Sequence, residues 1–194
     1  MGKLTDYVMN YNTVLFLPRT NEYGELYTFV LDKTSSFDVQ LGPTDLIDFN
    51  LKYYGSSLKG AREGAIMILG GGKMSPVMIN EKLDLYWFPS KSPAKEDCIW
   101  FALHHIKETI KLPNIRTKVI MSDGNIIIVE MSKESFDKKI QKAYNLKGKI
   151  EARTKIIPMH VSEVKGAYVI SKAEKGLNFE IISTLAQYKY RNNN

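Results

Sequence analysis

Residues 118–129 read KVIMSDGNIIIV, two short apolar runs separated by the dipeptide Asp123-Gly124. Both residues of the dipeptide tolerate a positive φ angle, which a tight turn between antiparallel strands requires. The segment therefore predicts a β-hairpin. Ser132 follows as the cap of a helix that extends to about Lys147, with acidic residues in its first half and lysines later, as the helix dipole favours. The apolar face of this helix consists of Phe136, Ile140, Ala143 and Tyr144.

The rest of the chain mixes strands and helices without regular alternation. Residues 13–17 and 26–31 are rich in β-branched and aromatic side chains and form a second predicted hairpin. Pro43 opens a helix that ends near Gly55. Such a mixture predicts an α+β fold, a mostly antiparallel sheet with a central helix, a basic helix after the last hairpin and a C-terminal amphipathic helix. Further strands are expected at residues 65–69, 76–79, 85–88 and 98–106, and the final helix is expected to contain Leu177, Ile181, Leu185 and Tyr188.

Two glycine-containing segments are expected to be irregular. Residues 56–64 are small and basic and are interpreted as a loop, and residues 70–72 as a flexible break. The three glycines precede Lys73, but a phosphate-binding loop needs a glycine at position 67 and a hydroxyl residue after the lysine. Methionine occupies both positions, so the phosphate-loop interpretation fails.

No other pattern indicates catalysis or a metal site. His104 and His105 are adjacent on a predicted strand, where neighbouring side chains point to opposite faces and cannot readily share one ion. Cys98 lies in an apolar strand and is expected to pack as a small hydrophobic residue, although a hydrolase that uses it as nucleophile is a remote alternative. We therefore expect a protein that is not an enzyme and holds no cofactor or metal.

Length and composition are those of a globular protein. The chain has 194 residues, of which 44% are hydrophobic and 25% charged, so one compact unit is the expectation and an additional small unit is the alternative. No apolar run approaches the length of a membrane span, and the first ten residues do not resemble a secretory signal. The single cysteine cannot form an intramolecular disulfide. These features predict a protein of the reducing cytoplasm.

Positive charge is concentrated in the last third of the chain. The formal net charge is +6, yet residues 1–132 hold 14 basic and 15 acidic side chains, whereas residues 133–194 hold 13 basic and 6 acidic ones. A one-sided excess of this kind attracts polyanions such as nucleic acid phosphates or an anionic membrane surface. The alternative is a solvated lysine-rich surface that keeps the protein soluble.

A second basic group lies at the end of the predicted central helix. Lys52, Lys59 and Arg62 flank a turn of small residues, where amides and hydroxyls can reach phosphate oxygens. Arg62 could also enter a narrow A·T-rich minor groove, where the negative potential is greatest. The alternative is that the glycines of this segment only turn the chain.

The order of short motifs resembles the ComK family of competence transcription factors. No single motif is specific, and the resemblance depends on their order and spacing over roughly residues 45–155. The matching landmarks are Tyr53-Tyr54-Gly55-Ser56-Ser57, Gly60, Arg62, Pro76-Val77-Met78-Ile79, Phe88-Pro89, Cys98-Ile99-Trp100, His105-Ile106-Lys107, Asp123-Gly124 and Ser135-Phe136.

The resemblance implies a transcriptional activator of DNA-uptake genes without catalytic activity. It implies that residues 1–160 form a DNA-binding domain, and that the protein binds A·T-rich promoter boxes of double-stranded DNA, mainly from the minor groove, as a homo-oligomer. Residues 161–194 are then a helical segment packed on this domain or used in oligomerisation. An adaptor of an ATP-dependent protease is a further implied partner. A membrane partner is not expected.

The candidate contacts to DNA rest on local chemistry, since the resemblance supplies no residue list. A protein-interaction module whose basic face meets an acidic partner remains the alternative function. The candidate DNA-binding residues are Lys52, Ser56, Ser57, Lys59, Arg62, Lys73, Lys138, Lys139, Lys142, Lys149 and Arg153.

Overall fold

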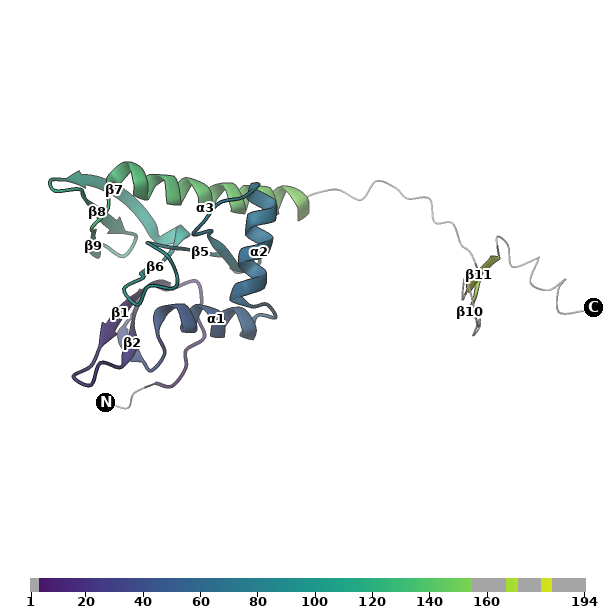
Figure 1. The fold of residues 1–194 in the computed structure, drawn as a ribbon, viewed down its shortest axis with the longest axis horizontal. Helices are drawn as coiled ribbons and strands as arrows, with labels where there is room; N and C mark the ends of the chain where they lie inside the picture. Colours follow the sequence, from purple (N-terminus) through teal and green to yellow (C-terminus); the bar gives the residue numbers. More distant parts are fainter. Residues whose placement is uncertain (1–3, 155–166, 171–178, 183–194) are drawn as a thin grey trace, which may run out of the picture. The chain divides into compact units, whose positions relative to one another are not determined.

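The computed structural model of the chain describes residues 4–154, 167–170 and 179–182 (Figure 1). The chain divides into two compact units, residues 1–155 and 156–194. The first unit contains two antiparallel sheets and the three helices of the described residues, so the α+β class is confirmed. None of these helices combines the length and apolar composition that crossing a bilayer requires.

A six-stranded antiparallel sheet forms the centre of the first unit. Its strands lie in the order β3-β2-β1-β6-β5-β4, so β1 pairs with β6 through Leu15 opposite Phe101 and Phe16 opposite Trp100. The successive residues Leu15 and Phe16 of β1 point to opposite faces of the sheet and enter two different clusters of buried side chains. The strands are β1 (Thr13–Thr20), β2 (Leu26–Asp32), β3 (Ser36–Val39), β4 (Val77–Asn80), β5 (Leu85–Pro89) and β6 (Trp100–Ala102).

Helix α1 (Pro43–Tyr53) covers one face of this sheet. Leu46, Ile47 and Leu51 point into a core that also contains both tryptophans of the chain. The buried Asn50 side chain fixes the N-terminal segment to the helix, because its Oδ1 accepts from the Met9 amide at 2.7 Å and its Nδ2 donates to the Leu46 and Tyr7 carbonyls. The predicted helix from Pro43 to about Gly55 is confirmed.

The opposite face packs against a smaller sheet and a long helix. The small sheet has the order β7-β8-β9, formed by β7 (Ile106–Leu112), β8 (Arg116–Met121) and β9 (Ile126–Val129), and the hairpin predicted at residues 118–129 is β8-β9. Helix α3 (Lys133–Thr154) follows it and runs longer than predicted. Phe136 of α3 lies against Phe88 and Phe101, with ring centroids 5.7 and 5.2 Å away.

One segment predicted as a loop and a strand is a helix. Helix α2 (Leu58–Leu69) replaces the loop at residues 56–64 and the strand at 65–69. Ser57 caps its N-terminus by accepting from the Gly60 amide at 3.1 Å, and Gly70 ends it in the left-handed conformation with φ 79°. Because packing and caps stabilise this helix, the low helix propensity of its two glycines does not prevent it.

The strand predicted at residues 98–106 is also corrected. Strand β6 ends at Ala102, and Leu103–His105 forms a 3-10 turn before β7 begins. The two histidines therefore do not point to opposite faces. Their rings lie 4.1 Å apart, and both Nε2 atoms approach the Tyr11 carbonyl, at 2.9 Å for His104 and 2.7 Å for His105.

The second unit contains an antiparallel pair, β10 (Ala167–Ile170) and β11 (Phe179–Ile182). Four residues of the final predicted helix are thus in a strand, and the prediction is wrong for Phe179–Ile182, where one phenylalanine and two isoleucines favour strand pairing. The remainder of that predicted helix, with Leu177, Leu185 and Tyr188, lies outside the described residues.

The histidine cluster predicts a pH dependence of stability. Both rings donate from Nε2 to one carbonyl oxygen, which can only accept, and His105 Nδ1 lies within hydrogen-bond distance of Ser122 Oγ at 2.6 Å. Burial, with a further contribution from His104, lowers the pKa of His105 to about 4. The unfolded chain takes up a proton on His105 near pH 6.5, whereas the folded chain does so only near pH 4. The contribution of His105 to the free energy of unfolding is therefore fully present above pH 6.5. It is lost as the pH drops toward 4, by up to about 3 kcal/mol.

Urea unfolding of the full chain at several pH values checks this prediction. Most of the loss of unfolding free energy between pH 6.5 and pH 5 should disappear in His105→Gln, because carboxyl groups titrate below that pH range. A wild-type unfolding free energy that stays constant from pH 7 to pH 5 would contradict it.

Candidate nucleic-acid interface

The end of α1 and the start of α2 bring five of the candidate DNA-binding residues together. Helix α1 ends at Tyr53, Gly55 turns the chain with φ 86°, and Ser57 caps α2. Figure 1 shows the two helices forming a corner at the surface of the unit. The residues gathered there are Lys52, Ser56, Ser57, Lys59 and Arg62.

Asp48 holds this corner together. Its Oδ1 accepts from the Leu58 amide at 2.7 Å, and its Oδ2 pairs with Lys52 Nζ at 2.8 Å. Burial raises the pKa of this carboxyl group, but the hydrogen bonds from Lys52 and Leu58 outweigh it, so the pKa of Asp48 is lowered. The charge of Lys52 is therefore partly balanced within the protein, which makes it a weaker candidate for phosphate than Lys59.

Arg62 differs from Lys52 because its guanidinium group forms no ion pair or hydrogen bond with the described residues. Its Nε is buried and has no hydrogen-bond partner among the described residues. The side chain lines a surface groove of about 570 Å³ between α1 and α2. The groove is mixed in charge, since its lining residues are Thr44, Asp45, Asp48, Lys52, Ser57, Leu58, Lys59, Arg62, Glu63 and Ile66.

Four of the candidate DNA-binding residues on α3 fall into two groups. Lys138 and Arg153 are exposed, which fits the prediction that they are available to phosphate. Lys142 Nζ instead donates to the Lys73 carbonyl at 3.0 Å, and Lys149 Nζ donates to the Ile68 carbonyl at 3.0 Å. These two hydrogen bonds reach carbonyl groups at the end of α2 and just after it. In the free protein, Lys142 and Lys149 therefore help to hold α3 against α2.

Lys139 and Lys73 lie near the same junction. Lys139 Nζ is 3.8 Å from the sulfur of Met74, and burial lowers its pKa, as it does that of Lys142. The Lys73 side chain is exposed. The sequence-predicted set therefore forms a corner at the start of α2 and a basic stripe along α3 that meets the end of α2.

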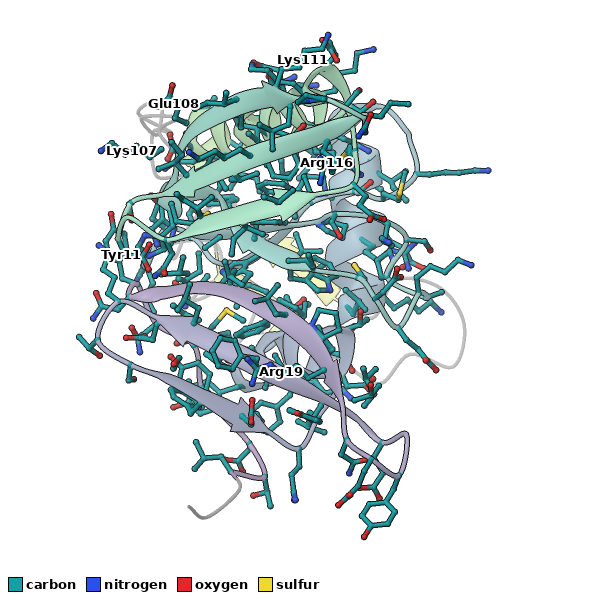
Figure 2. The ribbon with its side chains drawn as sticks, turned by 90° about the vertical axis from the view of Figure 1, so that its left-hand side faces the viewer. Tyr11, Arg19, Lys107, Glu108, Lys111 and Arg116 are labelled. Atoms are coloured by element: carbon teal, nitrogen blue, oxygen red, sulfur yellow. The ribbon has the colours of Figure 1, made fainter. Side chains whose placement is uncertain are left out.

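The hairpin β7-β8 is a basic and apolar feature that the sequence patterns do not reveal. Its turn residues Pro113, Asn114 and Ile115 project from the small sheet, and Ile115 is 75% exposed. The Pro-Asn pair is a turn signal, but nothing in the sequence marks Ile115 as exposed, because an isoleucine between strands is usually read as core. Figure 2 shows Lys111 and Arg116 on the strands that flank this turn.

The described residues offer little for metal or thiol chemistry. No three His, Cys, Asp or Glu side chains in residues 4–154 and the two described strands of the second unit gather as metal ligands. Cys98 is buried, its sulfur lies 3.6 Å from the Lys91 carbonyl, and burial raises its thiol pKa. A thiol of this kind stays protonated and is a poor nucleophile.

Comparison with known proteins supports one family. The sequence profile described as "ComK protein" matches residues 4–155 of the chain. The chain is 25% identical over 150 residues to a protein of Bacillus subtilis (strain 168) named "Competence transcription factor", and the match covers 77% of this chain and 78% of that protein. No solved structure matches.

Proposed function

The chain belongs to the ComK family, and from that premise we propose that it is a transcriptional activator of competence genes that binds DNA. The observation that supports this best is the corner between α1 and α2. There the exposed Lys59 lies with Arg62, which has no partner in the described part of the chain, on the first turns of a helix whose N-terminal amides attract anions. Two cations at a helix N-terminus oppose the helix dipole, and a bound phosphate would relieve that conflict.

We propose that the duplex is A·T-rich and is read mainly from the minor groove. An α-helix is about 10–12 Å wide and the minor groove only about 6 Å, so side chains enter the groove while α2 stays outside it. Arg62 is the proposed groove residue, because no described residue engages its guanidinium group. Proposed contacts to phosphate come from Ser56, Ser57, Lys59, Lys138 and Arg153.

The proposed function includes a homo-oligomer, and the outer face of the small sheet is the surface that favours it. Two rows of paired residues cross the three strands on this face. One row is Ile110, Lys118 and Ile128. The other is Glu108, Ile120 and Ile126, so four isoleucines share the face. Glu108 and Lys118 have no ion-pair partner among the described residues. An apolar face with one charge of each sign is complementary to a second copy of itself across a two-fold axis.

The same proposal covers the domain boundaries and the remaining partners. Residues 1–160 would form the DNA-binding domain, and residues 161–194 would pack on it or assist oligomerisation. An adaptor of an ATP-dependent protease would recognise the chain, and the protein would act in the cytoplasm without catalysis.

Titration of labelled duplexes tests the proposed function. A duplex with two A·T boxes one helical turn apart is compared by fluorescence anisotropy with a G·C-rich duplex of equal length, at two salt concentrations. We expect preferential binding to the A·T boxes that weakens steeply with salt and is displaced by a minor-groove drug. Equal weak binding to both duplexes would contradict it and would favour the alternative, a basic face that meets an acidic protein.

A further inference from the structure

The turn between β7 and β8 holds an isoleucine in a strained backbone conformation. Pro113, Asn114 and Ile115 connect the paired residues Leu112 and Arg116. The φ angle is 60° at Asn114 and 53° at Ile115. Asparagine visits the left-handed region with some ease, but a β-branched residue there is an outlier because its side chain crowds the backbone.

Folding alone gives no reason for an isoleucine at this position. Glycine is the residue that short hairpin connections normally place in the left-handed conformation. The Ile115 side chain is largely exposed to water, so burial offsets little of the strain. Strain of this kind persists where surrounding structure imposes it, and it is concentrated at functional sites.

The surroundings of the turn do impose its shape. Arg116 Nε donates to the Pro113 carbonyl at 3.4 Å across the turn. Lys111 Nζ lies 3.2 Å from Glu134 in the first turn of α3, and Thr109 Oγ1 donates to Asp137 at 2.8 Å. These contacts connect the hairpin to α3, so Ile115 lies at the tip of a hairpin whose position is fixed.

The charge of the hairpin favours a polyanion. Residues 106–121 carry four basic side chains against one acidic side chain, Glu108. Figure 2 shows Lys107 and Glu108 toward one end of β7, and Lys111 and Arg116 toward the turn. From there, α3 runs toward α2 (Figure 1), and its residue Lys149 donates to the Ile68 carbonyl near the end of α2, so the hairpin is continuous with the candidate interface.

We propose that Ile115 is a wedge that enters the minor groove and partly unstacks one base step of the bound duplex. Proteins that bind the minor groove insert aliphatic side chains in this way and kink the duplex toward the major groove, while flanking cations neutralise phosphates. Pyrimidine–purine steps such as TA unstack most readily, so the wedge selects boxes that contain them. This inference rests on the proposed DNA-binding function and adds a specificity-determining residue to it.

The experiment uses the full chain and a duplex with A·T boxes in which 2-aminopurine stands beside a TA step. Binding is followed by anisotropy, unstacking by 2-aminopurine fluorescence, and bending by energy transfer between dyes at the two ends. We expect wild-type binding to raise the fluorescence and shorten the end-to-end distance. Ile115→Gly and Ile115→Asn should abolish both signals and keep the salt dependence of binding, since no cation is lost.

Both substitutions suit the left-handed conformation, so neither should lower the melting temperature. Leu83→Asn is the matched control, because Leu83 is also an exposed apolar residue in a connection between strands, and it should leave both signals unchanged. Failure of the wild type to bind would overturn the proposed function and the wedge together. Binding without unstacking, or unstacking that persists in the Ile115 variants, would overturn the wedge alone.

Discussion

Replacing Phe136 with alanine should lower the free energy of unfolding by about 3–5 kcal/mol, the range typical of a fully buried phenylalanine. Phe136 has no exposed surface, and its ring meets those of Phe88 and Phe101 edge-on. Edge-to-face ring pairs contribute stability beyond that of the buried apolar area. Truncation to alanine removes both contributions and leaves a cavity. Since small domains are stable by about 5–15 kcal/mol, this loss is a large share of the total.

Denaturant titration of the full chain measures this loss. Tyr144→Ala is the matched control, because Tyr144 lies on the same helix with 47% of its surface exposed, and it should change the unfolding free energy by less than about 1 kcal/mol. Equal losses in the two variants would show that Phe136 does not anchor α3 to the large sheet.

Replacing Arg62 with alanine should weaken binding to A·T boxes by roughly thirtyfold, which corresponds to about 2 kcal/mol, the middle of the range of about 1–3 kcal/mol for a base-reading arginine. It should also reduce the ratio of affinities for A·T-rich and G·C-rich duplexes, because the removed cation is the one proposed to enter the narrow groove. The same anisotropy titration gives both quantities.

Lys59→Ala is the control for the Arg62 variant, since both residues lie on the first turns of α2 and each loses one positive charge. A lysine that contacts only phosphate should weaken both duplexes about equally and reduce the slope of log affinity against log salt by about 1. If Arg62→Ala leaves affinity and preference unchanged, Arg62 is not the groove residue, even where the protein binds DNA.

Periodic apolar patterns made much of the fold predictable. The β8-β9 hairpin follows from Asp123-Gly124 between apolar runs, and α1 and α3 follow from apolar residues at helical spacing. Helix α2 was not predictable in this way, because Gly60 and Gly64 weaken its propensity. Its stabilising contact to Asp48 comes from a residue ten positions before Leu58, and sequence periodicity does not register such a contact.

The candidate site was predictable at the level of residue type and only partly at the level of role. Lys52, Lys59 and Arg62 do come together at one corner. The sequence could not distinguish Lys138, which is exposed, from Lys149, which caps a carbonyl of another helix, because that difference depends on how α3 packs on α2. The strain at Ile115 likewise depends on a backbone angle that no residue pattern specifies.

The pairing of β1 with β6 also bears on how the chain leaves the ribosome. Strand β1 is complete early in synthesis, but Phe101, the partner of Leu15, emerges some 80 residues later, on the order of ten seconds at about 5–20 residues per second. During that interval the nascent β1-β2 hairpin presents an unpaired edge with apolar side chains. Such an edge is prone to pair with other chains, so a chaperone that binds extended apolar segments would find its target in this hairpin before β6 is made.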